Sequence, residues 1–224
     1  TWQGENGKQT SGDMLPPLQC ESEAARQIES QLNFNIVNHE QIDDDKVMPD
    51  FFPVYWQIHN KRFNIDTPTT YAADSRGVLL GYAIEYPLTN LKTDLHLLQP
   101  SKYSVDREGT MAWKAIVDDA IGDILPTKIE NINLHWYFCL TALAVNLLGM
   151  ERLFVSMYDC PDEFHQMMAF IRDDSLAFVK WMEDEKLLTL NNENHYAGSG
   201  SYGFTSQLPK SNEYAQTGKV ILKD

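Results

Sequence analysis

The most chemically varied stretch of the sequence is a polar run, Asn191-Asn192-Glu193-Asn194-His195-Tyr196. Glu193 and His195 are separated by a single residue, so in a loop both side chains can point into one cavity, where a carboxylate and an imidazole can transfer protons. The amide of Asn192 can hydrogen-bond a polar substrate. We therefore predict Glu193 and His195 as catalytic residues and Asn192 as a substrate-binding residue. The alternative is a polar loop that caps a helix.

A second polar cluster is formed by Glu130, Asn131 and Asn133, with His135 just beyond them. These residues stand at the far end of a predicted strand, where polar side chains of an α/β enzyme can reach a substrate. We predict that Glu130 and Asn133 bind substrate. The alternative is that they are buried polar groups with all their hydrogen bonds made inside the fold.

Two aromatic residues, Tyr55 and Trp56, end an apolar stretch at residues 47–56, and His59 follows beside Lys61 and Arg62 in the segment QIHNKRF. The aromatic pair is predicted to contact a flat organic ligand. His59, with its basic neighbours, can meet an anionic group such as a carboxylate or phosphate. A solvated loop is the alternative for His59.

Each of these clusters follows a predicted strand, and helices are expected between the strands. Residues 78–86 are rich in β-forming side chains and are predicted as a strand or hairpin arm, and residues 123–133 as a buried strand. Helices are predicted at residues 21–34, where asparagines end the helix, and at residues 138–149. A third helix is predicted to begin at an N-capping Ser104 and to stop at Gly122. A fourth is predicted to begin at Pro161, with Ile171, Phe178 and Met182 on the face that packs in the core.

The alternation of helices with short apolar strands predicts an α/β fold with a parallel sheet. Because the carboxyl ends of parallel strands converge on one face, we expect Tyr55, Trp56, Glu130, Asn133 and the residues from Asn192 to His195 to line one pocket for a small-molecule substrate.

The net charge of −14 at pH 7 disfavours binding to nucleic acid, because the phosphate backbone would be repelled. The longest apolar run, residues 134–150, contains His135, Thr141 and Asn146 and predicts a buried helix and no membrane span. Three dispersed cysteines lack the spacing of a zinc site or redox pair, so we predict no metal site in this chain. Together with an N-terminus that lacks a signal peptide, these cysteines predict a cytoplasmic protein.

Three segments resemble the uroporphyrinogen decarboxylase superfamily: GDILPTKIENIN, MYDCPDEFHQMMAFIRDDSLAFVKWM and LLTLNNENHYAGSGSYGF. Upstream, ESEAARQIESQL and DDDKVMPDFF resemble a bacterial subgroup associated with corrinoid-dependent methyl transfer. The resemblance implies a (β/α)8 barrel of the TIM type. The sequence supplies only about four βα units, so we expect an incomplete barrel. Residues 1–45 are then an N-terminal extension with one helix, and residues 46–224 are the first part of the barrel.

The resemblance implies a corrinoid-dependent methyltransferase, which would work with a corrinoid protein and hold zinc through a His-x-Cys motif and a later Cys beyond Asp224. The alternative is a tetrapyrrole decarboxylase. It is disfavoured because the family's Arg-rich signature is absent and Tyr55 and Trp56 stand where its Asp is expected. A non-catalytic barrel fragment is the third possibility, and its open sheet edges would favour a dimer.

Overall fold

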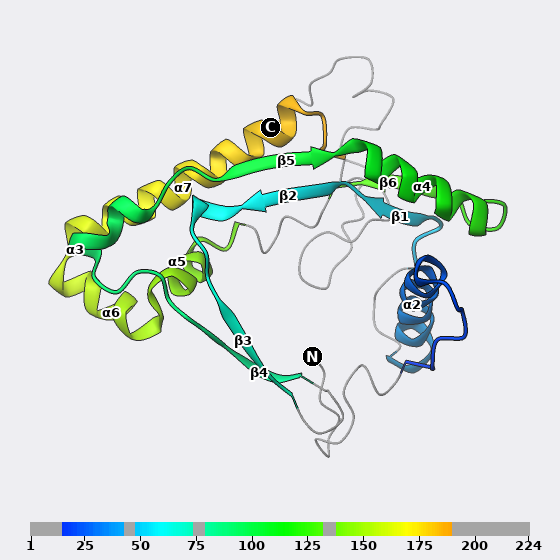
Figure 1. The fold of residues 1–224 in the computed structure, drawn as a ribbon, viewed down its shortest axis with the longest axis horizontal. Helices are drawn as coiled ribbons and strands as arrows, with labels where there is room; N and C mark the ends of the chain where they lie inside the picture. Colours follow the sequence, from blue (N-terminus) through cyan, green and yellow to red (C-terminus); the bar gives the residue numbers. More distant parts are fainter. Residues whose placement is uncertain (1–14, 43–47, 74–78, 132–137, 190–224) are drawn as a thin grey trace, which may run out of the picture. The chain divides into compact units, whose positions relative to one another are not determined.

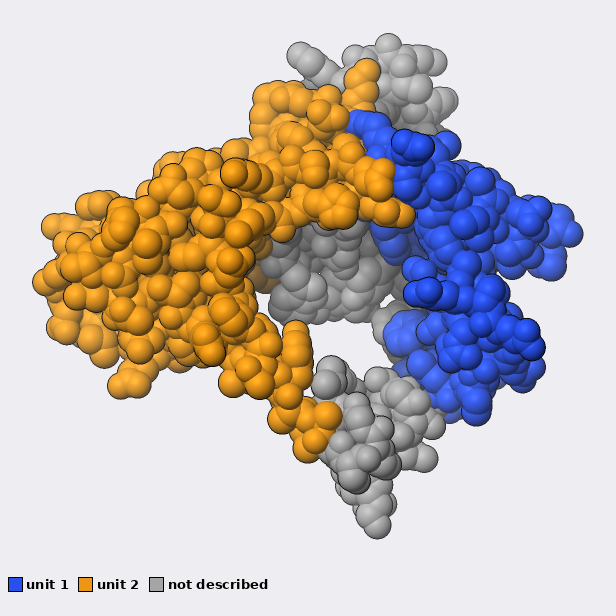
Figure 2. All heavy atoms as spheres, viewed as in Figure 1, with its two compact units in different colours: residues 1–56, 107–133, 189–224 blue, residues 57–106, 134–188 orange. Residues whose placement is uncertain are grey.

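A computed structural model describes residues 15–42, 48–73, 79–131 and 138–189 (Figure 1). The chain divides into two compact units whose segments interleave along the sequence (Figure 2). Unit 1 comprises Thr1–Trp56, Arg107–Asn133 and Thr189–Asp224, and unit 2 comprises Gln57–Asp106 and Leu134–Leu188.

Unit 1 contains a βαβ arrangement. Its elements are the helix α2 (Glu23–Val37) with the π-helical turn η1 (Asn38–Ile42), the strand β1 (Phe52–Tyr55), the helix α4 (Arg107–Ile121) and the strand β6 (Thr127–Glu130). The two strands pair in parallel, with Phe52 opposite Thr127 and Tyr55 opposite Glu130. Both are edge strands, which is why Pro53 is tolerated within β1. Helix α4 packs against both strands, and the unit's core is Ile28, Phe52, Val54 and Val117.

The ends of the unit 1 helices differ in part from the sequence prediction. Helix α2 begins after an N-capping Ser22, whose side chain accepts a hydrogen bond from the Ala25 amide. It continues past Asn33 and Asn35 and ends at Asn38, the last of the asparagines that were expected to end it. Burial of Val37 against the unit outweighs the weak helix propensity of asparagine. Helix α4 ends before Gly122 as predicted. A Cβ atom at Gly122 would lie 2.4 Å from the Asp118 carbonyl oxygen, so only glycine fits there.

Unit 2 combines two antiparallel strand pairs with a group of helices. Its strands are β2 (Gln57–Lys61), β3 (Thr69–Ala73), β4 (Leu79–Ile84) and β5 (Lys102–Asp106). Its helical turns are η2 (Arg62–Asn64), α3 (Leu91–Asp94) and η3 (Leu95–Leu97), and its longer helices are α5 (Leu140–Leu148), α6 (Met150–Asp159) and α7 (Pro161–Asp184).

The core of unit 2 lies among α3, α5, α6 and α7. Helix α7 begins with Pro161 at its first turn, as predicted, and its Ile171, Phe178 and Met182 are fully buried. Helix α5 buries Leu143, Ala144, Leu147 and Leu148, which confirms the helix predicted at residues 138–149. Because α5 has no charged side chain, it is stable only when covered on most sides.

A buried polar network joins the strand β5 to α7. The Asp174 carboxylate accepts hydrogen bonds from the Ser101 amide at 2.7 Å and the Ser101 hydroxyl at 2.6 Å. The Ser101 oxygen accepts in turn from the amide of Phe63 at 2.7 Å, and the Tyr103 hydroxyl donates to the Asp174 carbonyl at 3.2 Å. The network satisfies buried polar groups that would otherwise destabilise the fold.

The expected (β/α)8 barrel, complete or incomplete, is wrong. Within the described ranges the sheets are three separate strand pairs, of which only β1–β6 is parallel, while β2–β5 and β3–β4 are antiparallel. Residues 79–84 do form a strand, but it returns along β3 as a ribbon instead of entering a βα unit. Ser104, expected to cap a helix, lies inside β5 opposite His59, so that helix begins at Arg107. Local sequence signals specify strands, whereas strand partners depend on contacts distant in sequence.

None of the described helices is by itself long and apolar enough to cross a membrane. Helices α5 and α6 meet the length and composition criteria only as a pair, and that pair is bent by 96°.

Candidate functional site

The carboxyl ends of β1 and β6 bring together three residues that the sequence singled out. Tyr55 is the register partner of Glu130, and the Trp56 amide donates a hydrogen bond to the Glu130 carbonyl at 3.2 Å. Tyr55 is 46% exposed, and Trp56 is half-buried. These three residues meet because the strands of a parallel pair end on the same side, and their role as substrate-binding residues stays a prediction.

Thr189 adds a network of hydrogen bonds at the same end of β6. Its hydroxyl lies 2.9 Å from Glu130 Oε2 and 2.5 Å from Asn131 Oδ1, and its amide donates to Asn131 Oδ1 at 2.9 Å. A hydroxyl has one proton, so Thr189 can donate to Glu130 or to Asn131 but not to both at once. The network fixes the Glu130 carboxylate at the end of the strand.

Arg107 is the third component of the site. It is the first residue of α4, and its guanidinium carbon lies 5.2 Å from the centre of the Trp56 ring, within the range of a cation–π contact. The site thus combines a carboxylate, an amide, a hydroxyl, two aromatic rings and a cation. This mixture suits a small organic ligand that has both a flat apolar part and polar groups.

Sequence reasoning missed Arg107 and Thr189 and noted Asn131 only as a member of its cluster. Arg107 was placed inside a helix that was expected to begin at Ser104, so its position at the helix start was not foreseen. Thr189 was not singled out, although it lies two residues before Asn191, where the polar run begins, and this position was the available signal.

The remaining predicted site residues lie in unit 2 or outside the described residues. His59 belongs to unit 2, where it is exposed on β2 opposite Ser104, and its role in binding stays a prediction. Its neighbour Lys61 forms an ion pair with Asp66 at 3.1 Å. The predicted residues Asn133, Asn192, Glu193 and His195 lie outside the described residues and stay predictions.

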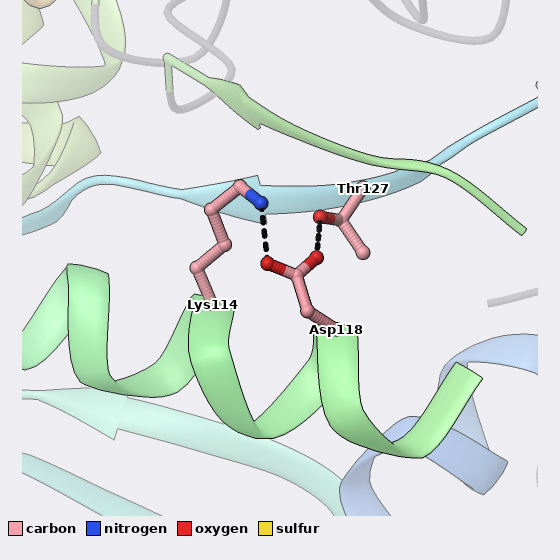
Figure 3. A network of polar contacts seen from close by, with 3 residues as sticks. All are labelled: Lys114, Asp118 and Thr127. Atoms are coloured by element: carbon pink, nitrogen blue, oxygen red, sulfur yellow. Dashed lines mark hydrogen bonds and ion pairs between the residues drawn. The ribbon is translucent and has the colours of Figure 1, made fainter. Parts of the chain in front are cut away.

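The amino end of β6 holds a contrasting polar cluster (Figure 3). Asp118 of α4 accepts a hydrogen bond from Lys114 Nζ at 2.6 Å and another from the hydroxyl of Thr127, the first residue of β6. The Lys114 ammonium group, followed by the Thr127 hydroxyl, lowers the pKa of the Asp118 carboxyl group below its usual value. These contacts tie α4 to the start of the strand, so this cluster is structural.

Among the side chains that the structure describes, no three His, Cys, Asp or Glu residues converge as a metal site, and Cys20, Cys139 and Cys160 are free thiols.

No family model matches the sequence, and searches of the curated proteins and of the solved structures find no match.

Proposed function

We propose that this protein is an enzyme that acts on a small organic substrate at the carboxyl end of the β1–β6 pair. The proposal rests on one observation: Tyr55, Trp56, Glu130, Asn131 and Thr189 lie together where two parallel strands end. In open α/β arrangements, ligands bind outside the carboxyl ends of the strands. At the amino end of the same pair, the contacts of Asp118 with Lys114 and Thr127 hold α4 to β6.

The reaction we propose is corrinoid-dependent methyl transfer, as the resemblance to the uroporphyrinogen decarboxylase superfamily implies. In transfer to a thiol, the sulfur loses its proton and uses an electron pair to bond the methyl carbon. The donor keeps the electron pair of the bond that breaks. A corrinoid protein is the proposed partner that would supply the methyl donor.

The chain's own residues have three roles in this proposal. Glu130 accepts the proton of the acceptor, and the Thr189 hydroxyl orients the Glu130 carboxylate through the 2.9 Å contact. The rings of Tyr55 and Trp56 bind the flat part of the substrate, and Arg107 holds the Trp56 ring in place. Glu193 and His195 remain the predicted catalytic pair in the segment that follows Thr189.

The proposal is tested by mixing the protein with methylcobalamin and 2-mercaptoethanesulfonate and following the visible absorbance that reports loss of the methyl group. We expect demethylation by the wild-type chain and a rate at least ~100-fold lower for Glu130→Gln, the loss typical of removing a general base. Asp118→Asn is the matched control and should keep the rate. Binding is read separately, as quenching of tryptophan fluorescence by methylcobalamin.

Two outcomes would contradict the proposal. One is that the wild-type chain neither binds nor demethylates methylcobalamin. The other is that methylcobalamin has no effect while uroporphyrin binds and shifts its own absorption band, which would favour the decarboxylase alternative.

A further inference from the structure

Helix α6 of unit 2 presents an apolar face to solvent. Met150, Phe154 and Tyr158 follow one another at four-residue spacing and are 54%, 58% and 91% exposed, and Val155 and Met157 beside them are 50% and 43% exposed. The opposite side of the helix faces the core through Leu153 and Ser156. Methionine and aromatic side chains exposed together on one surface are typical of protein–protein interfaces.

Helix α6 begins at a sharp corner at Gly149. Helices α5 and α6 meet there at 96°, and Gly149 has a φ of +77°, which favours glycine (Figure 1). The ring of Tyr86 packs so closely that a Cβ atom at Gly149 would lie 2.8 Å from it. The corner lets α5 be buried while α6, the next helix, exposes its apolar side chains.

The surroundings of the apolar face are acidic. Glu151 and Asp159 are exposed on α6, and Asp162 is exposed at the start of α7. Arg152 is the exposed basic residue of α6, and its guanidinium donates a hydrogen bond to the Leu148 carbonyl at 3.3 Å. From Glu151 to Asp162 the exposed charges are therefore three acidic groups and one basic group, and the whole chain has a net charge of −14. A cationic partner is therefore attracted to this region, and an anionic one is repelled.

We propose that the exposed face of α6 binds a basic amphipathic helix of another protein. The partner's apolar side chains would pack on Phe154 and Tyr158, and its Lys or Arg residues would lie near Glu151 and Asp159. An apolar helix face that docks onto an apolar surface is a common mode of peptide recognition. A second copy of this chain would bring its own −14 charge, and anionic lipid would be repelled likewise, so both fit less well. The surface is independent of the proposed active site.

The experiment uses the full chain and a fluorescent peptide of about 18 residues, long enough to form a helix, with Leu on one face and Lys on the other. Fluorescence anisotropy measures binding. We expect saturable binding that weakens at least about tenfold in the double variant Phe154→Ser with Tyr158→Ser, the loss expected for two aromatic contact residues. The matched control is Leu176→Ser, an equally exposed apolar residue on α7, which should leave binding unchanged.

The acidic surroundings are tested with two further comparisons. The same peptide with Glu in place of Lys should not bind, and Glu151→Gln with Asp159→Asn should weaken the Lys peptide and reduce its salt dependence. Because all these side chains are exposed, the variants should keep the wild-type circular dichroism spectrum.

Several outcomes would overturn the proposal. Equal binding of the Lys peptide to the double variant and to the wild type would show charge attraction with no apolar docking. Equal binding of the Glu peptide and the Lys peptide would show that the acidic residues do not select a cationic partner. Sedimentation that shows a dimer lost in the double variant, or binding to phosphatidylcholine vesicles lost in that variant, would identify a second copy or a membrane as the occupant instead.

Discussion

The two ends of the β1–β6 pair use the same kind of side chain in different ways. At the amino end, the carboxylate of Asp118 contacts Lys114 one turn earlier on α4 and Thr127 at the start of β6, so its contacts connect neighbouring elements. At the carboxyl end, the carboxylate of Glu130 contacts Thr189, which is distant in sequence, beside the exposed ring of Tyr55. Asp118 stabilises the unit through these contacts, whereas Glu130 serves a ligand in the function proposed above.

The largest effect on stability should come from Gly122→Ala, at the amino end of the pair. The new Cβ atom would be 2.4 Å from the Asp118 carbonyl oxygen, so the end of α4 must shift. We expect a loss of about 1–3 kcal/mol in the free energy of unfolding, measured by urea titration, as for other substitutions that overpack a tight site. Binding of methylcobalamin by the folded fraction should persist. Wild-type stability in this variant would show that the end of α4 is not fixed as described.

A smaller effect, this time on activity, should come from Thr189→Val. The substitution keeps the shape of the side chain but removes the hydroxyl that contacts Glu130 and Asn131. We expect about a tenfold lower rate of methyl transfer, since one hydrogen bond to a charged group is worth roughly 1.5 kcal/mol. The matched control is Thr127→Val, which removes the corresponding hydroxyl at the amino end and should lower stability without lowering the rate. If Thr127→Val lowered the rate and Thr189→Val lowered only the stability, the amino end of the pair would be the functional end and the carboxyl end the structural one.

The smallest effect should be a change in the pH dependence of stability at Asp118. Because its pKa is lowered in the folded state, chiefly by the Lys114 hydrogen bond, ionised Asp118 stabilises the fold above the ordinary pKa of an aspartate, about 3.9. That contribution is lost as the pH falls through the lowered value. The melting temperature of the wild type should therefore fall more steeply below pH 4 than that of Asp118→Asn. Parallel curves for the two proteins would contradict this role.

Much of the helical structure could be predicted from the sequence, because its signals are local. Pro161 followed by two carboxylates marks the start of α7, and Gly122 marks the end of α4. Helix α6 was not predicted, because its apolar residues are distributed over both its buried and its exposed sides. Helix prediction from periodicity depends on apolar residues that lie on one face only, so it does not detect such a helix.

The strand pairing could not be predicted, and this is why the barrel was wrong. The strand β3 has the sequence Thr-Thr-Tyr-Ala-Ala and is exposed throughout, so no buried face indicated that it would pair with β4. Tyr55 and Glu130 lie together because they end the two strands of one parallel pair, and Trp56 follows Tyr55 directly, while their role as a site stays a prediction. Arg107 and Thr189 come close to these residues because of contacts between segments that are distant in sequence, and local sequence patterns do not specify such contacts.

The most direct test of the central claim compares two matched substitutions, Glu130→Gln and Asp118→Asn, each of which replaces a carboxylate with its amide at one end of the same strand pair. For both variants, the rate of methylcobalamin demethylation and the urea midpoint of unfolding are measured side by side. We expect Glu130→Gln to lose the activity and keep the wild-type midpoint, and Asp118→Asn to keep the activity and unfold at lower urea. If Glu130→Gln kept full activity, or if it lost activity only to the extent that it lost stability, the carboxyl end of the pair would not be the functional site.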